Sequence, residues 1–289
     1  MPELPEVEVV KRSLERKILN LIIKQVTVKD GNLRYKVNKE EISKIKGGKI
    51  KKIVRRSKFL LFRFDKKYFM LVHLGMTGKF FFINKKKRKI KTSFYYNLDS
   101  SKDKKHDRVI FHFSKNQKLI YNDVRKFGFI KFYNSNNPDN NFHLKNLGLE
   151  PLEKRFNTKY FKKYIFGRNR TIKNILMDQK FISGLGNIYA NEILFLSGIS
   201  PKRKVKKITD YEINKIIINI KKVLKASIKL GGSSIKNFSS DDGKKGDFQQ
   251  YFMVYGRKGE KCSNVDCNES IIRIVISNRA TFFCNKCQK

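Results

Sequence analysis

The first residues of the chain place a proline beside a carboxylic acid, a pair that suits amine chemistry. The sequence opens Met1-Pro2-Glu3. Because residue 2 is small, the initiator methionine can be removed, which leaves Pro2 with a free secondary amine. An α-amino group titrates near pH ~8, so a useful fraction is unprotonated at neutral pH. Such an amine can attack a sugar C1′ and form an iminium, while Glu3 donates or shuttles a proton. The alternative is that Pro2 and Glu3 only begin a helix.

A second group of reactive side chains lies at the other end of the chain. All four cysteines follow the pattern Cys262-x4-Cys267-x16-Cys284-x2-Cys287. Two short-spaced pairs joined by a longer arm can hold Zn²⁺ tetrahedrally in a closed, structural site. The arm, 271–283, is expected to fold as a hairpin that turns at 277–279. The alternative is four free thiols, and a zinc hairpin alone does not define a function.

Short β-rich runs should position the N-terminal residues. Helical spacing of apolar residues predicts a helix over 2–19, with Pro5 in its first turn. The β runs that follow, with few long helices between them, favour an antiparallel sandwich or barrel. They are Leu21–Val28, Lys49–Phe64, Tyr68–Val72, Lys79–Asn84, Arg108–Phe113, Lys118–Tyr121 and Phe127–Tyr133. The lysine-rich stretch 85–106 between two of them is expected to be a mobile loop.

The pattern becomes helical in the second half of the chain. Asn134–Asn141 is polar and contains Pro138, so we expect a linker over 134–157. The clearest helix is Asp210–Leu230, which Gly231 and Gly232 terminate. We therefore expect an α+β protein with an N-terminal β domain at 1–133, a helical domain at 158–250 and a cysteine module at 251–289. Residues 231–250 within the helical domain have the composition of a flexible loop.

The net charge indicates a polyanionic partner. The chain has 66 Lys and Arg against 25 Asp and Glu, a formal charge of +41. Lysines and arginines that neutralise phosphates release condensed counterions, which favours nucleic acid. Part of the lysine excess has another explanation, an AT-rich coding bias, and an acidic membrane surface is another candidate partner. No apolar run reaches the ~18 residues of a spanning helix, and no secretory signal is seen. A cytoplasmic, nucleoid-associated location is expected.

Several motifs occur in an order that carries more information than any one of them. They are MPELPEVEVV, RRSKFLLF, HLGMTG, YNDVRKFG, LGLEPL, MDQKFISGLGNIYANEILF and the cysteine module. Together they closely resemble bacterial formamidopyrimidine-DNA glycosylase, over essentially the whole chain. The resemblance implies an N-terminal β-sandwich with an N-terminal helix, and a C-terminal helical domain. Within the latter it implies a helix–two-turns–helix at 171–200 and a zinc β-hairpin.

The resemblance also implies roles for individual residues in the reaction. Pro2 matches the Schiff-base nucleophile and Glu3 the general acid. Lys58 matches the family's strand lysine, the proton donor in β-elimination; without the family it would be a phosphate ligand or a solvated charge. Arg279 matches the arginine credited with a phosphate contact and proton donation in δ-elimination. Glu192 falls at the family's glutamate that faces the active site.

Three further residues match a device for extruding a base. Met76 matches the methionine that fills the hole left by the flipped nucleotide, although on its own it would be a lid on the core. Arg125 and Phe127 match the companion wedge, which bonds the orphaned cytosine and inserts between base pairs. An enzyme that acts on a base inside a duplex must extrude it, and apolar wedges offset that cost.

The remaining matches concern binding. DNA contacts are implied for His73, His106, Arg168 and Asn187. Asn187 ends a glycine-rich turn whose amides suit phosphate, although the same turn can be a plain connection between helices. Residues 231–250 resemble the segment that closes over the oxidised purine. The implied partner is duplex DNA with oxidised bases or abasic sites, bound by a monomer that carries one structural Zn²⁺.

Two features depart from the family, and two other functions compete with the main one. The first cysteine pair is spaced x4 where x2 is usual, and 85–106 is unusually rich in lysine. The related endonuclease VIII, which prefers oxidised pyrimidines, is the nearest alternative; Leu4 and the Met76, Arg125 and Phe127 set favour the purine enzyme. A noncatalytic zinc-hairpin protein that binds nucleic acid would explain the charge and cysteines but not the ordered N-terminal motifs.

Overall fold

The structure, a computed structural model, describes residues 1–83, 89–91, 102–134, 138, 141–233 and 248–289. Most of the stretch 85–106, and residues 234–247 of the expected loop 231–250, lie outside this range. The chain forms two compact units. Unit 1 comprises Met1–Lys145 and Leu230–Asp247, and unit 2 comprises Asn146–Lys229 and Phe248–Lys289.

Unit 1 begins with the helix α1, Leu4–Ile18. Glu3 is its N-cap and forms a capping box with Glu6, whose Oε2 accepts a hydrogen bond from the Glu3 amide at 2.9 Å. Pro5 lies in the first turn, as predicted. The prediction of a helix over 2–19 is wrong at its start, because Pro2 and Glu3 precede the first helical residue. These two residues therefore keep an extended backbone ahead of the helix.

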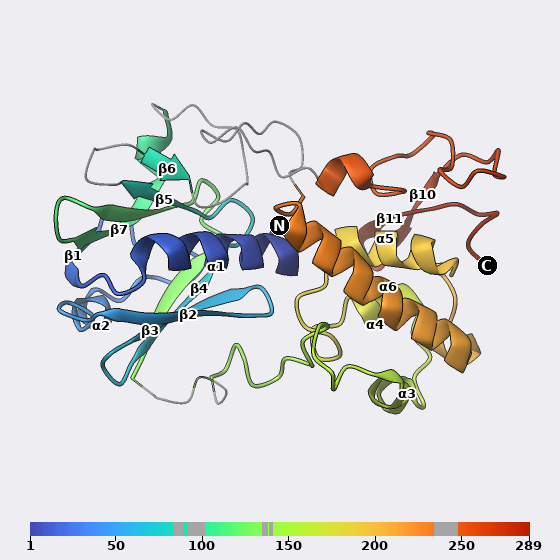
Figure 1. The fold of residues 1–289 in the computed structure, drawn as a ribbon, viewed down its shortest axis with the longest axis horizontal. Coiled ribbons are helices and arrows are strands. Elements are labelled where there is room, and N and C mark those ends of the chain that lie inside the picture. The colour runs from blue at the N-terminus through green and yellow to red at the C-terminus, as the bar shows by residue number, and fades with distance from the viewer. Residues whose placement is uncertain (84–88, 92–101, 135–137, 139–140, 234–247) are drawn as a thin grey trace. The chain divides into compact units, whose positions relative to one another are not determined.

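Two antiparallel sheets follow, and they confirm the predicted sandwich. The five-stranded sheet has the order β1-β7-β8-β5-β6, with β1 Ile23–Val28, β7 Asp107–Phe113, β8 Lys118–Asn122, β5 Lys79–Ile83 and β6 Lys89–Lys91. The four-stranded sheet has the order β2-β3-β4-β9, with β2 Ile50–Arg56, β3 Phe59–Phe64, β4 Phe69–His73 and β9 Phe129–Tyr133. In Figure 1 these sheets lie above and below α1. The short helices α2, Lys39–Ser43, and η1, Lys102–His106, were not predicted.

One apolar core joins the sheets to α1. The buried stripe of α1 comprises Val7, Val10, Leu14 and Ile18, and it packs in the same cluster as inward-facing residues of both sheets. Aromatic and β-branched side chains dominate those strands, as strands half-covered by a core require. Because α1 is fixed along its whole length by this burial, the residues just before it are held against the sandwich.

The β-rich run Lys49–Phe64 is a hairpin of two strands. It turns at Ser57 and Lys58 between β2 and β3. Ser57 has φ +56°, a left-handed conformation that glycine or asparagine usually supplies. Because the turn contains neither residue, its signal was absent from the sequence. Lys58 consequently lies in a turn, and its expected place on a strand is corrected.

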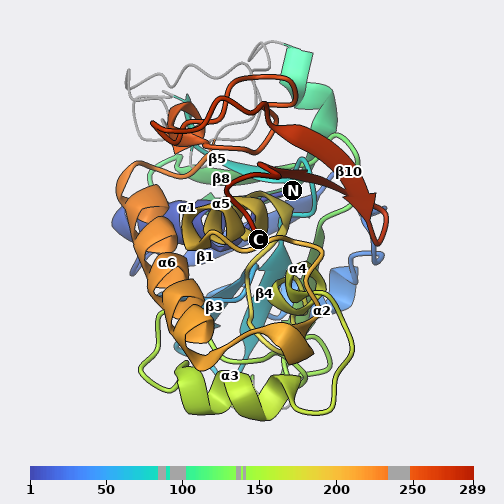
Figure 2. The same ribbon diagram turned by 90° about the vertical axis from the view of Figure 1, so that its right-hand side faces the viewer.

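Unit 2 contains four α-helices in the part of the chain that the structure describes: α3 Thr158–Ile165, α4 Ile172–Leu176, α5 Asn187–Ser197 and α6 Asp210–Lys229. Helix α5 packs against α6, α4 and the strand β11, and α3 packs against α6 (Figure 2). The 3-10 turns η3, Val205–Lys207, and η4, Phe248–Tyr251, complete the connections. The helix predicted over Asp210–Leu230 is confirmed as α6, which ends one residue earlier at Lys229.

The predicted cysteine-module hairpin is present. Strands β10, Ile272–Ile276, and β11, Arg279–Phe283, pair antiparallel around Ser277 and Asn278. Both turn residues have positive φ, +46° and +59°, as a two-residue hairpin turn requires. Among the described residues, no helix combines the length and the apolar character needed to cross a membrane.

Candidate active site and nucleic-acid interface

The N-terminal amine of unit 1 lies among charged side chains. Pro2 and Glu3 are buried, directly ahead of α1. Burial lowers the pKa of the Met1 amino group, the negative charges of Glu3 and Glu6 oppose that shift, and the positive charges of Lys58 and Arg125 add to it. The structure thus brings the predicted residues Pro2, Glu3, Lys58 and Arg125 together around the chain terminus.

Glu6 has a role in this arrangement that the sequence interpretation missed. One of its oxygens binds the Glu3 amide, and the other, Oε1, accepts from the Ser233 amide at 2.8 Å and the Ser233 hydroxyl at 3.0 Å. Gly232 approaches so closely that an added Cβ would lie 3.1 Å from Glu6 Oε1. A glutamate three residues after an N-cap was a visible signal for the first bond. The second bond joins residues 227 positions apart, for which the sequence held no signal.

Lys58 is held in its turn and is only 8% exposed. The Arg55 guanidinium donates to the Ser57 carbonyl at 3.0 Å and pairs with Glu8 of α1 at 3.0 Å. The turn is therefore tied to the same helix that fixes Pro2 and Glu3. A lysine placed this way can act on a group near the terminal amine, either as a proton donor or as an anion ligand.

The turn that carries Met76 follows β4. Met76 is half-buried, and Gly75 before it has φ +62°. A Cβ on Gly75 would lie 2.4 Å from the backbone of Phe127 and Gly128, so only glycine allows this approach. The Met76 turn and the loop 123–128 therefore touch backbone to backbone.

The His73 ring supports the Met76 turn from within the fold. Its Nδ1 accepts from the Gly75 amide at 3.0 Å, and the ring stacks on Phe129 at 5.7 Å between centroids. Burial, assisted by the positive charges of Lys58 and Arg34, lowers the pKa of His73 to about 4. The ring is therefore neutral at physiological pH, with its proton on Nε2.

Arg125 and Phe127 project from the loop 123–128 as a pair. Both are exposed, Phe127 by 47%. The Arg125 guanidinium carbon lies 4.6 Å from the centre of the Phe127 ring, a cation–π contact. In such a pair the aromatic ring can stack on a base, and the guanidinium can donate hydrogen bonds to the edge of a base.

His106 lies at the end of η1. Its Nδ1 is 3.3 Å from Arg108 Nη2, and Arg108 pairs with Asp30 at 2.6 Å. The ring is half-buried, so one edge remains at the surface.

In unit 2, Asn187 joins the start of α5 to the hairpin that carries Arg279. Its Nδ2 donates to the Ala280 carbonyl at 2.9 Å, and the buried Lys173 of α4 donates to the same carbonyl at 3.1 Å. Lys173 also donates to the Thr281 hydroxyl at 2.6 Å. Arg279 itself is exposed as the first residue of β11. These bonds fix the two residues that follow Arg279 in β11, while the Arg279 side chain stays at the surface.

Glu192 is buried in α5 and binds backbone in unit 2. Its two oxygens accept from the amides of Met253, Val254 and Tyr255 at 2.8 to 3.1 Å. Burial raises the pKa of Glu192, and these three amide bonds oppose the rise. The resemblance led us to expect a glutamate that faces the active site; in the structure its carboxylate anchors the segment 253–255.

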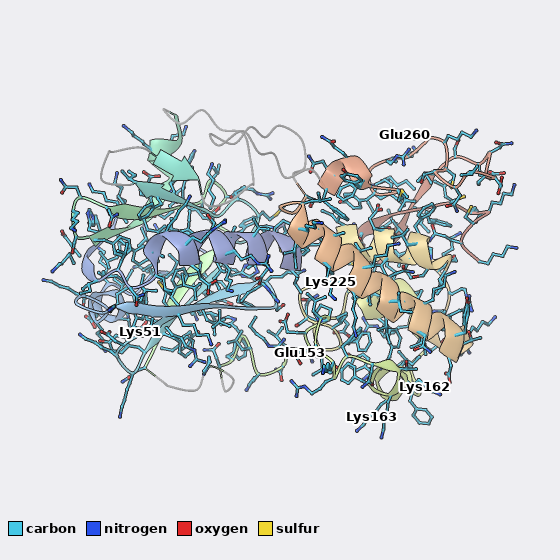
Figure 3. The ribbon with its side chains drawn as sticks, viewed as in Figure 1. Lys51, Glu153, Lys162, Lys163, Lys225 and Glu260 are labelled. Carbon is cyan, nitrogen blue, oxygen red and sulfur yellow. The ribbon has the colours of Figure 1, made fainter. Side chains whose placement is uncertain are left out.

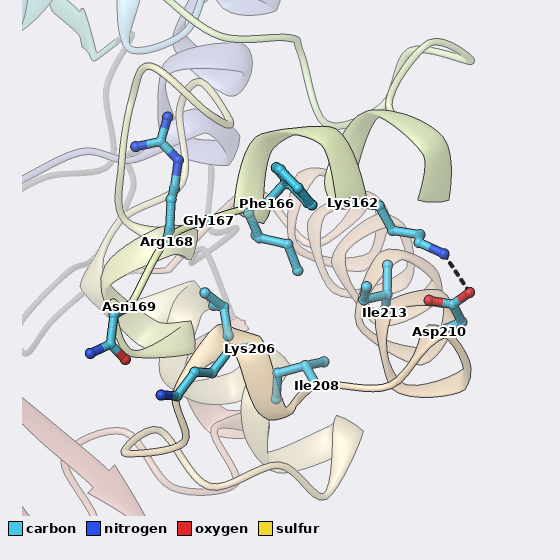
Figure 4. Close-up of a pocket in the computed structure, with 11 residues that line it drawn as sticks. Lys162, Phe166, Gly167, Arg168, Asn169, Lys206, Ile208, Asp210 and Ile213 are labelled. Atoms are coloured by element: carbon cyan, nitrogen blue, oxygen red, sulfur yellow. Dashed lines mark hydrogen bonds and ion pairs between the residues drawn. The ribbon is translucent and has the colours of Figure 1, made fainter.

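Arg168 lies apart from this hairpin network, after α3. Its Nε donates to the Tyr164 carbonyl, and its guanidinium lies 4.3 Å from the centre of the Tyr164 ring. It borders a pocket of about 560 Å³ between α3 and the start of α6 (Figure 4). The pocket has an apolar floor that includes Ile208 and Ile213, and Lys162 at its rim pairs with Asp210 at 2.7 Å.

The four cysteine sulfurs form a compact cluster. All lie within 4.8 Å of one another, with Cys262 and Cys287 at 3.9 Å and Cys267 and Cys284 at 3.6 Å. A tetrahedral ion with Zn–S bonds of ~2.3 Å places its sulfurs about 3.8 Å apart. The donor set therefore fits a metal. The four residues between Cys262 and Cys267 are accommodated by a turn in which the Cys267 amide donates to the Asn264 carbonyl at 3.1 Å.

Exposed lysines cover both units. Figure 3 labels Lys51 on β2, Lys225 on α6, and Lys162 and Lys163 on α3, all at the surface. The positive charge is therefore spread over many elements, and only part of it belongs to the site.

A sandwich with a buried terminal amine, together with a helical unit that holds a four-cysteine hairpin, defines a class of two-unit enzymes. Family models agree with this class. Residues 1–130 match the formamidopyrimidine-DNA glycosylase N-terminal domain, and residues 147–239 match the formamidopyrimidine-DNA glycosylase H2TH domain. The chain belongs to the formamidopyrimidine-DNA glycosylase family.

Individual relatives cover the whole chain. It is 41% identical over 289 residues to the formamidopyrimidine-DNA glycosylase of Rickettsia bellii (strain OSU 85-389), with 100% of both chains covered. It is 40% identical over 288 residues to that of Wolbachia pipientis subsp. Culex pipiens (strain wPip), again with 100% of both covered. Among solved structures, the Lactococcus lactis Fpg bound to DNA containing an abasic site has a TM-score of 0.84 and 33% identity, over 99% of each chain. A mutant of that protein bound to Fapy-dG containing DNA has a TM-score of 0.85 and 33% identity, over 100% of each chain.

Proposed function

We propose that the chain is a DNA glycosylase and AP lyase of base excision repair that removes oxidised purines from duplex DNA. Its substrates are 8-oxoguanine opposite cytosine and ring-opened formamidopyrimidines. One observation carries the proposal: the terminal amine lies beside the buried side chains of Glu3, Glu6 and Lys58. A purely structural N-terminus does not need three buried ionisable groups around it, and such clusters mark functional sites. The names of the relatives support the same activity.

The reaction begins once Met1 is removed and the Pro2 nitrogen becomes a secondary amine. That amine attacks C1′, the bond from C1′ to the base breaks, and the base leaves with a proton. Glu3 protonates the sugar ring oxygen as the ring opens, which leaves an iminium between Pro2 and C1′. Glu6 keeps Glu3 in place, because the Glu6 carboxylate accepts a hydrogen bond from the Glu3 amide and is itself held by the Ser233 amide.

The iminium acidifies the 2′ proton, so β-elimination breaks the strand on the 3′ side. The 2′ proton passes to solvent, the bond from C3′ to the phosphate oxygen breaks, and Lys58 donates a proton to the leaving phosphate. δ-Elimination then breaks the 5′ side, with Arg279 as proton donor and phosphate ligand, and leaves a one-nucleotide gap. Water finally releases the sugar fragment and restores the amine.

The wedge residues present the base to this chemistry. Met76 fills the space of the extruded nucleotide, Phe127 inserts between base pairs, and Arg125 bonds the orphaned cytosine. His73, His106, Arg168 and Asn187 contact the DNA backbone. The exposure of Arg125 and Phe127 and their mutual contact support these roles.

The four cysteines hold one structural Zn²⁺, which supplies no chemistry to the reaction. Bound zinc fixes the hairpin that carries Arg279. The protein acts as a monomer in the cytoplasm, in contact with the nucleoid, and the proposed domains are 1–133, 158–250 and 251–289 around a linker at 134–157.

Borohydride trapping tests the proposal. Purified protein is mixed with a duplex containing 8-oxoguanine opposite cytosine, the imine is reduced, and the adduct is mapped by mass spectrometry. We expect a covalent protein–DNA adduct at Pro2, with gapped product in unreduced samples. The Glu3→Gln variant should still be trapped on an abasic duplex while it loses excision of 8-oxoguanine, because no base has to leave there. Absence of any adduct from folded, Met1-free, metal-loaded protein on both duplexes would refute the amine mechanism. A preference for oxidised pyrimidines in competition would instead indicate an endonuclease VIII-like specificity.

A further inference from the structure

Asp123 is a buried carboxylate that the proposed reaction does not use. Its side chain is fully buried at the start of the loop 123–128. Oδ1 accepts from the Thr77 hydroxyl, and Oδ2 accepts from the Gly128 amide at 2.8 Å. Thr77 follows Met76 in its turn, and Gly128 follows Phe127 in its loop. One carboxylate therefore binds the two segments that carry the wedge.

Thr77 also holds Arg125, the third wedge residue. Its oxygen accepts from the Arg125 amide at 3.0 Å while its hydroxyl donates to Asp123. Asp123 therefore holds each wedge residue by a short route. It binds the hydroxyl of Thr77, next to Met76, and the amide of Gly128, next to Phe127. It reaches Arg125 through Thr77, whose oxygen accepts from the Arg125 amide.

The Asp123 backbone is held as firmly as its side chain. Its amide donates to the His106 carbonyl at 3.1 Å, and its carbonyl accepts from Arg108 Nε at 2.9 Å. Arg108 is in turn paired with Asp30 at 2.6 Å. The Asp123 backbone is thus attached to the five-stranded sheet through Arg108 of β7. The sheet in this way restrains the wedge residues that Asp123 holds.

We propose that Asp123 is the positioning residue of the wedge: it locks the Met76 turn to the Arg125 and Phe127 loop, so that the three side chains enter a duplex as one unit. This inference rests on the proposed function. Asp123 touches neither the substrate nor the reacting atoms in this scheme. A wedge must be in place before the base is extruded, and small misplacements of positioning groups are costly. The lock should matter where a base has to be displaced and matter little where none is stacked.

Two substitutions remove the lock in different ways. Asp123→Asn keeps the size of the side chain but replaces one acceptor oxygen by a donor. Thr77→Val keeps the shape of Thr77 and removes the hydroxyl that Asp123 and Arg125 share. Thr77→Ser retains the hydroxyl and is the matched conservative variant. Thermal unfolding of each variant shows whether it is folded at the assay temperature.

The discriminating measurement compares two substrates under single-turnover conditions. One is a duplex with 8-oxoguanine opposite cytosine, and the other is a single strand with an abasic site, in which no base has to be extruded. We expect Asp123→Asn and Thr77→Val to lose roughly 10- to 100-fold on the duplex and to stay within about threefold on the single strand. Thr77→Ser should resemble the unchanged protein, and the double variant should be no worse than Asp123→Asn, because both changes break one lock.

A binding readout separates this inference from the proposed function. A duplex with 2-aminopurine beside the lesion brightens when a wedge unstacks it, and this signal requires no chemistry. The inference predicts a large signal with the unchanged protein and with Thr77→Ser, and a weak one with Asp123→Asn and Thr77→Val. Equal losses on both substrates, or an undiminished 2-aminopurine signal in the folded variants, would overturn it. If the unchanged protein traps no DNA but the signal still separates the variants, the amine chemistry of the proposed function fails, while its duplex binding, on which the inference rests, is retained.

Discussion

Three charged residues of unit 1 are buried in its interior. Glu3, Glu6 and Lys58 are 4%, 2% and 8% exposed. Removing an ion from water costs several kcal/mol even after relaxation, so a buried ionic cluster is weak evidence for stability. Its persistence here is explained by the reaction that we propose for it. Replacing one of these charges should therefore affect chemistry more than folding.

Lys58 provides the clearest case. Lys58→Met keeps the length of the side chain and removes its charge, and the melting temperature should fall because Glu3 and Glu6 stay buried without that cation. Strand cleavage at an abasic duplex should fall roughly 10²- to 10⁴-fold, the usual range for loss of a general acid. Thermal unfolding and single-turnover cleavage measure the two effects, with Lys51→Met on the exposed face of β2 as control. A large loss of stability with little loss of cleavage would assign Lys58 to the fold.

His73 makes a pH-dependent contribution to stability. Its pKa in the folded protein is about 4, below the unfolded value of 6.5. The unfolded chain binds the proton first, so this contribution is complete above pH 6.5 and is lost as pH falls towards 4. It amounts to about 3 kcal/mol. The melting temperature should therefore fall more steeply between pH 6.5 and 4 in the unchanged protein than in His73→Gln, whose amide oxygen can still accept from Gly75. Parallel curves would show that His73 is not buried as a neutral ring.

Sequence motifs pointed to the residues that we propose to be reactive, but not to the groups that hold them. Pro2, Glu3 and Lys58 were identified by type, order and resemblance, and unit 1 places them around one amine. Asp123 and Glu6 were missed because each also binds a residue distant in the chain, Thr77 for Asp123 and Ser233 for Glu6. A carboxylate bonded in this way has the same local sequence as an exposed one.

At the scale of elements, periodicity predicted most strands and the long helices, and local chemistry explains the exceptions. The β-rich run Lys49–Phe64 was not divided at Ser57 and Lys58 because the turn there lacks glycine and asparagine. The helix α2 is short, and only its Asn38 cap marked it, with the side chain accepting from the amides of Glu40 and Glu41. Strand order, such as β9 beside β4, depends on tertiary packing and has no local signal.

The stability of the cysteine hairpin should depend on a bound metal, whereas the stability of unit 1 should not. Bonds from a metal to four sulfurs within 4.8 Å of one another would add to the small apolar cluster that this module has. Removal of the metal by a chelator, or Cys267→Ser, should speed amide hydrogen exchange in β10 and β11 and release about one zinc per chain. Exchange in β2, β3 and β4 should stay the same, because these strands have their own core. Hydrogen exchange with mass spectrometry and metal analysis test both statements. Unchanged exchange in a zinc-free hairpin would show that the hydrogen bonds from Lys173 and Asn187 suffice to hold it.

For the whole molecule, the main question is how much of its charge of +41 binds DNA. Exposed lysines lie on β2, α3 and α6 alike, a spread that a coding bias explains as well as a binding face does. Long-range attraction raises the rate of encounter with DNA for all of them. Only residues that neutralise phosphates in the complex release counterions, so the salt dependence of binding counts those residues and ignores the rest.

Arg168 and Lys51 offer a direct comparison, since each substitution removes one exposed positive charge. In our assignment Arg168 contacts the DNA backbone, so Arg168→Ala should reduce the slope of log K against log salt by about 1. Lys51→Ala should leave the slope unchanged and slow association slightly at low salt. Fluorescence anisotropy with a duplex that carries a stable abasic analogue gives both slopes. The salt concentration is varied from roughly 50 to 200 mM, an interval over which six to ten phosphate contacts lower the affinity by about 10³- to 10⁵-fold. Equal changes in the two variants would mean that charge acts diffusely over the whole surface, and Arg168 would then lose its place among the specific DNA contacts.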